Sequence, residues 1–239
     1  MNQMTTPRRN RWTGKVTMTT AIHESGHAIA RLALNEACPY PGPRLKEITA
    51  RPGGDYSGLT TSDARCRSFP TLAQIREEVA PGAPDPAGLV AGAVRDCRLD
   101  IVETWVGPLA EIGPRGGLLG SAVAFLPGAD QDGDLGAIRH RLRWLGLGDG
   151  AEAEAECERL WWAALALVQA ERAGILAVAK VLHREGTMDG EAFEAAWREV
   201  RPTVAQRMAR WNAPGWSGNR AEAERHGISY RDGVLHLPD

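Results

Sequence analysis

Two histidines four residues apart, His23 and His27, constrain this chain more than any other feature of its sequence. They lie in the string HESGH, in which Glu24 directly follows the first histidine. Apolar residues recur around them at helical spacing, namely Ala21, Ile22, Ala28, Ile29, Leu32 and Ala33. The pattern therefore predicts a packed amphipathic helix that Thr19 or Thr20 caps and that ends near residue 35.

This spacing has a chemical meaning, because side chains four positions apart lie on the same face of a helix. The HExxH pattern is typical of zinc sites in which both histidines are ligands and the glutamate is a general base. A catalytic zinc ion needs a third protein ligand and keeps a fourth position for water. Asp130, Asp132 and Asp134 form an acidic run further along the chain. This acidic run has no glutamate at EF-hand spacing, so it does not indicate a calcium loop.

The composition excludes several classes of protein. Of the 239 residues, 43% are apolar and 24% are charged, and the formal net charge is -2, so no basic field indicates nucleic-acid binding. No apolar run reaches the length of a membrane span, and no apolar stretch of a signal peptide follows the N-terminal arginines. The four cysteines are widely spaced and favour reduced thiols. We therefore expect a cytoplasmic protein that binds neither nucleic acid nor membrane.

The periodicity along the rest of the chain predicts a mainly α (α+β) fold with a small sheet near the histidine-bearing helix. Strands are expected at residues 45–51 and 56–61, paired across a turn at 52–55. Helices are expected at residues 72–79, 87–112, 134–145, 151–184 and 189–211, with Asp189 as a candidate cap of the last. We expect a flexible segment at residues 1–18, one domain at 19–211 and a loosely packed C-terminal tail at 212–239.

Five strings resemble, in the same order, the FtsH family of membrane-anchored, ATP-dependent zinc proteases. Residues 20–28, TAIHESGHA, are similar to the TAxHEAGHA of that family. Residues 45–61, 101–112, 128–138 and 176–193 resemble its strand and turn, its "AE" helix, its aspartate-bearing segment and its closing helix pair. The matches cover roughly residues 19–200, so the resemblance implies a helical zinc-peptidase domain over that range.

The resemblance places the third zinc ligand in the segment 128–138, where the candidates are Asp130, Asp132 and Asp134. In the family the third zinc ligand lies at the start of a helix, and an aliphatic residue follows it directly. Asp134, followed by Leu135, fits this pattern, and Asp132 is the alternative ligand.

A zinc-dependent metallopeptidase is therefore the function that the resemblance implies. His23, His27 and Asp134 are expected to bind Zn²⁺, and Glu24 is expected to act as general base. Glu111 takes the place of the glutamate in the family's "AE" helix. It is expected either to orient a ligand histidine or to be an ordinary exposed carboxylate.

The chain also departs from the family pattern. It contains no Walker motif and no membrane anchor, so we expect peptides or unfolded proteins as substrates, with a separate ATPase or a homo-oligomer as partner. The family's glycine–arginine pair is Gly107-Pro108 here, and the proline predicts either a first helical turn or a kink. The strand at residues 56–61 is expected to border the cleft and pair with an extended peptide, or to be an ordinary edge. The alternative function is a non-catalytic peptidase-like module that binds zinc or a protein partner.

Overall fold

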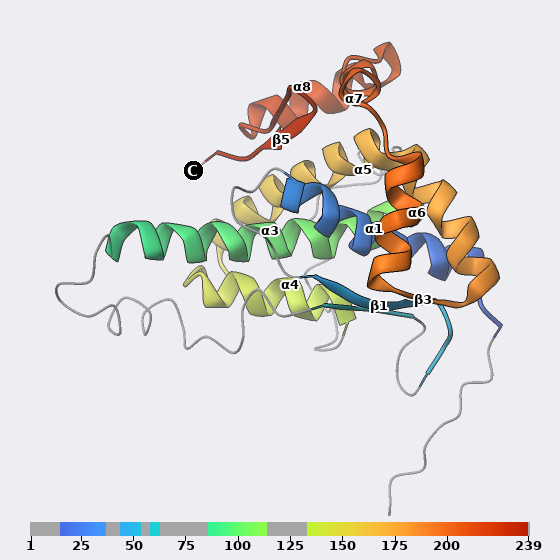
Figure 1. The fold of residues 1–239 in the computed structure, drawn as a ribbon. Coiled ribbons are helices and arrows are strands. Elements are labelled where there is room, and N and C mark those ends of the chain that lie inside the picture. The colour runs from blue at the N-terminus through green and yellow to red at the C-terminus, as the bar shows by residue number, and fades with distance from the viewer. Residues whose placement is uncertain (1–14, 37–43, 54–57, 63–85, 114–132, 239) are drawn as a thin grey trace, which may run out of the picture.

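The computed structural model describes residues 15–36, 44–53, 58–62, 86–113 and 133–238, and these form a mainly helical fold with two small antiparallel sheets (Figure 1). The helices are α1 (Met18–Glu36), α3 (Pro86–Ile112), α4 (Gly133–Trp144), α5 (Ala151–Glu185), α6 (Gly190–Val200), α7 (Val204–Trp211), the 3-10 turn η3 (Pro214–Trp216) and α8 (Ser217–Arg225). The strands are β1 (Leu45–Thr49), β2 (Leu59–Ser62), β3 (Thr187–Asp189), β4 (Ser229–Arg231) and β5 (Val234–His236). The predicted fold class is confirmed. The expected helix at residues 72–79 and most of the expected N-terminal segment lie outside the described residues.

Helix α1 lies at the centre of the helical packing. It contacts both α3 and α5, which also contact each other. Its predicted apolar face is confirmed, since Ala28 and Ile29 are fully buried. The predicted cap is wrong, because the helix begins at Met18 and the residue before it therefore takes that position. Thr17 Oγ1 accepts a hydrogen bond from the backbone N–H of Thr20 at 3.0 Å.

The three-stranded sheet has the order β2–β1–β3, and both pairings are antiparallel. Ile48 of β1 is fully buried and lies between Thr60 of β2 and Met188 of β3. The predicted pairing of the first two strands is confirmed. The third strand was not predicted, because its three residues between two helices are too few to show a period. Within the described residues β2 pairs with β1 alone, and so it forms an edge of the sheet that contacts α1.

The single helix predicted at residues 189–211 is wrong, because the chain forms two helices there, α6 and α7. Pro202 separates them, since a proline disfavours helical conformation in the residue before it. Arg201 accordingly has φ −59° and ψ 139°. Asp189 caps α6 as predicted, and Thr203 caps α7 through a capping box.

The expectation of a loosely packed tail after residue 211 is also wrong. Trp216 and Ile228 are buried and belong to the main hydrophobic core. Helices α7 and α8 pack against α5, on its far side from the three-stranded sheet (Figure 1). Arg207 of α7 donates a 2.6 Å hydrogen bond to the buried carboxylate of Glu171 in α5. Glycine, asparagine and aspartate surround these few apolar residues in the sequence, so the local composition concealed their burial.

Candidate metal centre

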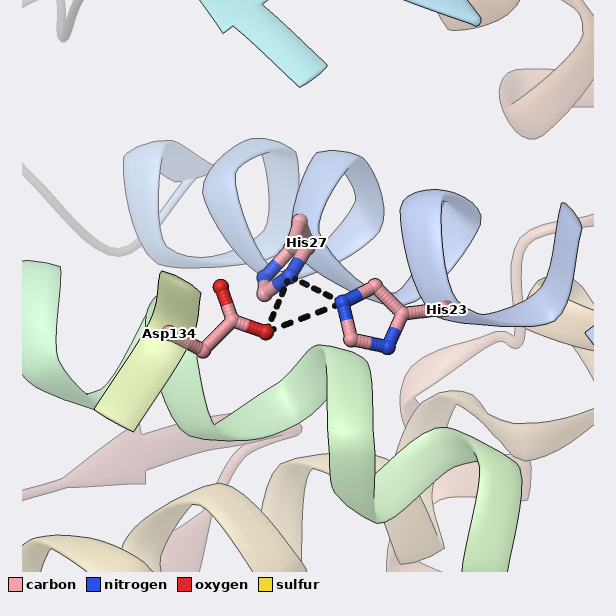
Figure 2. A group of neighbouring side chains, drawn as sticks. All are labelled: His23, His27 and Asp134. Carbon is pink, nitrogen blue, oxygen red and sulfur yellow. Dashed lines mark hydrogen bonds and ion pairs between the residues drawn. The ribbon is translucent and has the colours of Figure 1, made fainter. Parts of the chain in front are cut away.

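Helix α1 brings the two histidines together on the side that faces α3 and α4 (Figure 2). The Nε2 atoms of His23 and His27 are 3.0 Å apart. Their rings meet edge to face, with centroids separated by 4.7 Å. This convergence follows from the helical spacing of four residues alone.

The third member of the group, Asp134, comes from the first turn of α4. Its Oδ2 atom lies 2.9 Å from Nε2 of His23 and 3.4 Å from Nε2 of His27 (Figure 2). The structure therefore places the expected aspartate against both histidines, and these three side chains form a group that could hold a metal ion. Asp130 and Asp132 lie outside the described residues.

The donor atoms of the group fit a divalent metal ion. Zinc binds imidazole nitrogen and carboxylate oxygen at about 2.0–2.2 Å, so tetrahedral angles place neighbouring ligand atoms about 3.3–3.5 Å apart. The separations of 2.9, 3.0 and 3.4 Å lie at or slightly below that spacing. Two imidazoles and one carboxylate suit zinc, and they also suit iron(II). The side chain of Asp134 is 31% exposed, so the group is accessible to solvent.

The other ring nitrogen of each histidine has its own partner. Nδ1 of His23 lies 2.5 Å from Oε1 of Glu111, and Nδ1 of His27 lies 2.9 Å from the backbone carbonyl oxygen of Glu103. A carbonyl oxygen can only accept, so Nδ1 of His27 carries a hydrogen, and in the neutral ring it is Nε2 that has the lone pair available for a metal ion. Such outer partners orient metal-binding imidazoles. The contact between Glu111 and a histidine, which the resemblance implied, is present.

The side chain of Glu103 ties α1 to α3 beside the second histidine. It receives two hydrogen bonds from Arg31, one from Nε at 2.9 Å and one from Nη2 at 2.6 Å. Both side chains are almost buried, and paired contacts of this kind are strong and directional. Because Arg31 follows His27 by one helical turn, this ion pair holds α1 and α3 in place next to the group of His23, His27 and Asp134, called the candidate metal group below.

Two glycines allow α1 and α3 to approach closely. A Cβ atom on Gly107 of α3 would lie 2.3 Å from Nε2 of His27. A Cβ atom on Gly26 of α1 would lie 3.0 Å from the carbonyl oxygen of Val106. The ring of His27 therefore occupies space that exists only because residue 107 has no side chain. Pro108 lies inside α3, so the alternative of a first helical turn does not hold.

Glu24 is 5% exposed, and its carboxylate contacts strand β2. Thr60 Oγ1 donates a hydrogen bond to Oε2 of Glu24 at 2.8 Å. Burial raises the pKa of Glu24, and the nearby His27 and His23 oppose that rise. A carboxylate with a raised pKa is better suited to take up a proton near neutral pH than an exposed one.

The group attracts positive charge. Burial disfavours the charged imidazole of His23, but the hydrogen bonds that its ring donates to Asp134 and Glu111 outweigh this effect and raise the pKa of His23 to about 10. Burial also lowers the pKa of His27, but the contacts of its ring with Asp134 outweigh this effect, so the pKa of His27 is raised as well. The pKa of Asp134 is lowered, because its contacts with both histidines outweigh the effect of its burial. A metal ion would satisfy the same attraction as these protons.

Reasoning from the sequence offered the strand at residues 56–61 as a border of the cleft but did not identify Thr60 and Gly58 as contacts of Glu24, and it missed Glu103 and Gly107 as parts of this site. A glycine inside a predicted helix signals close packing, so Gly107 carried a detectable sign. The other three carried none, because a threonine, a glycine or a glutamate at such positions is common in any globular protein.

Within the part of the chain that the structure describes, no second group of three His, Cys, Asp or Glu side chains comes together. In the same residues, no helix combines the length and the apolar character that crossing a membrane would require. No protein-family model and no curated protein matches this chain.

Proposed function

We propose that this chain is a zinc-dependent metallopeptidase of the FtsH type that hydrolyses peptide bonds. The observation that supports this most is the position of Asp134, which lies far along the chain and yet contacts both histidines of the HExxH helix. A buried glutamate adjoins the same group, as general-base catalysis requires.

Each residue has a defined task in this proposal. His23, His27 and Asp134 would hold the ion, which when bound acts as a Lewis acid and lowers the pKa of water to about 7. Glu24 takes a proton from the attacking water at its carboxylate and later returns it to the leaving amine. Glu111 keeps the ring of His23 oriented through Nδ1. The presence of Glu24 favours hydrolytic zinc chemistry over the iron(II) chemistry that the donor set also permits.

The proposed substrate is an extended segment of polypeptide. Strand β2 is an edge strand within the described residues and contacts Glu24 through Thr60, so a peptide that paired with this edge would pass close to the general base. We propose peptides and unfolded proteins as substrates, supplied by a separate ATPase partner or within a homo-oligomer. The buried thiols of Cys97 and Cys157 suit the reducing cytoplasm, which is the proposed location.

Metal analysis of the purified protein tests the proposal. We expect about one zinc ion per chain and no stoichiometric iron in the wild type, as measured by elemental mass spectrometry. Asp134→Ala loses most of this zinc, whereas Asp149→Ala, which removes an exposed aspartate of the α4–α5 loop, retains it.

Cleavage of casein, an unfolded protein, tests the chemistry. The wild type should cleave casein in a chelator-sensitive reaction. Glu24→Gln should keep its zinc and lose at least about 100-fold in rate, because the general base is gone. Undiminished cleavage by Glu24→Gln would refute the catalytic assignment. Bound zinc without any cleavage would instead favour the non-catalytic binding module.

A further inference from the structure

The carboxylate of Glu24 touches strand β2 and the residue directly before it. Thr60 Oγ1 lies 2.8 Å from Oε2 and 3.2 Å from the backbone carbonyl oxygen of Glu24. Gly58 lies against the other carboxylate oxygen, since a Cβ atom there would be 2.6 Å from Oε1 and 2.8 Å from Cγ. The hydroxyl group of Thr60 and the missing side chain of Gly58, one residue before the strand, therefore define where this carboxylate lies.

The direction of the Thr60 side chain follows from the register of the sheet. Thr60 pairs with Ile48 of β1, whose side chain is fully buried. Neighbouring side chains on a strand point to opposite faces. Thr61, the next residue, accordingly has other contacts, and its Oγ1 donates to the backbone carbonyl of Glu47 at 3.1 Å.

We infer that Thr60 is a positioning residue for the general base, and that Gly58 provides the space which the base occupies. This inference rests on the proposed peptidase function. The hydroxyl group of Thr60 donates to Oε2 and so fixes the orientation of the Glu24 carboxylate. Neither residue lies within hydrogen-bond distance of the proposed metal ligands, so their effect is on the base and not on the metal.

The arrangement also links the base to substrate docking. A peptide that added to the edge of β2 would pair with backbone groups of the strand whose side chain holds Glu24. Substrate docking and orientation of the base would then depend on one segment of four residues. Removal of the Thr60 hydroxyl should therefore slow the chemical step and leave peptide binding largely intact.

Three variants of the full-length, zinc-loaded protein test the inference, with fluorescently labelled casein as substrate. Thr60→Val keeps the shape and removes the donor, so kcat should fall about 10- to 100-fold while KM changes less than about twofold. Thr60→Ser restores the hydroxyl and should return kcat to within about threefold of the wild type. Thr61→Val, the matched control on the opposite face, should behave as the wild type does. Zinc content should be equal in all four proteins.

Crystal structures of the zinc-loaded wild type and Thr60→Val give a reading that does not depend on activity. We expect the Glu24 carboxylate to contact Thr60 in the wild type and to leave this position in the valine variant. An unmoved carboxylate in Thr60→Val would overturn the inference, and so would an equal loss of activity in the serine variant or a loss of zinc. A wild type that binds zinc and cleaves nothing would refute the peptidase proposal, while the two crystal structures would still decide whether Thr60 places Glu24.

Discussion

Gly107→Ala is the most direct test of how the fold builds the candidate metal group. In the wild type a Cβ atom at this position would lie 2.3 Å from Nε2, 2.4 Å from Cε1 and 2.8 Å from Cδ2 of His27. Non-bonded carbon and nitrogen atoms need about 3.5 Å, so the ring or the helix must move by roughly 1 Å. The displaced atom is the nitrogen that would bind the metal.

The magnitude follows from two opposing effects. Alanine is favoured over glycine inside a helix by about 1 kcal/mol, whereas overpacking of a buried site costs about 1–3 kcal/mol. The metal-free protein should therefore lose at most about 2 kcal/mol of unfolding free energy. The affinity for zinc should fall by at least the 10- to 100-fold that loss of an outer partner of a ligand typically causes.

Competition with a chromogenic chelator measures zinc affinity, and urea unfolding of the metal-free protein measures stability. Gly92→Ala is the matched control, because Gly92 belongs to the same helix and a Cβ atom there would meet nothing within 4 Å. We expect Gly92→Ala to keep wild-type zinc affinity and to be slightly more stable. Wild-type zinc affinity in Gly107→Ala would refute the argument that His27 and Gly107 share this space in a metal centre.

Three further predictions concern the contacts around this site and the core. Glu111→Gln should weaken zinc binding by about tenfold or more in the same competition assay, whereas Glu154→Gln on an exposed part of α5 should not. Burial raises the pKa of the Cys157 thiol to about 12, so the native state keeps a proton that the unfolded state loses above its ordinary value near 9. Between pH 7 and pH 10 the free energy of unfolding, measured with urea, should therefore fall by about 1.4 kcal/mol more in the wild type than in Cys157→Ala. Equal pH dependence of the two proteins would contradict this. Trp216→Ala should cost about 3–5 kcal/mol of unfolding free energy, whereas a tryptophan in a loose tail would cost almost nothing.

Predictions from local patterns succeeded where the pattern was long. The helices expected at residues 87–112, 134–145 and 151–184 match α3, α4 and α5 closely, because each spans several turns of apolar periodicity. The errors occurred where a single residue mattered but the composition of the surrounding stretch indicated a different structure. The break at Pro202 was overlooked within a strongly amphipathic stretch, and the burial of Trp216 was hidden by polar neighbours.

The third side chain of the candidate metal group could not be chosen from the residues alone. The acidic run left Asp130, Asp132 and Asp134 equivalent, and only the family resemblance favoured the last. Spacing from His27 could not decide among them, because the distance depends on how α4 docks against α1 and α3. The structure places Asp134 within 2.9 Å of a histidine, and its role as a ligand stays a prediction for metal analysis to test.

The helix that carries His23, Glu24 and His27 could be predicted from the sequence, since the geometry of an α-helix brings residues four apart onto one face. The class of fold could be predicted as well, because helical and strand periods are local properties. The neighbours of those three side chains depend on packing in three dimensions: Asp134 from α4, the Glu103 carbonyl of α3 and the Thr60 hydroxyl of β2. Those contacts join segments distant in the chain, and they arise from how apolar faces pack together, which no single stretch of sequence encodes.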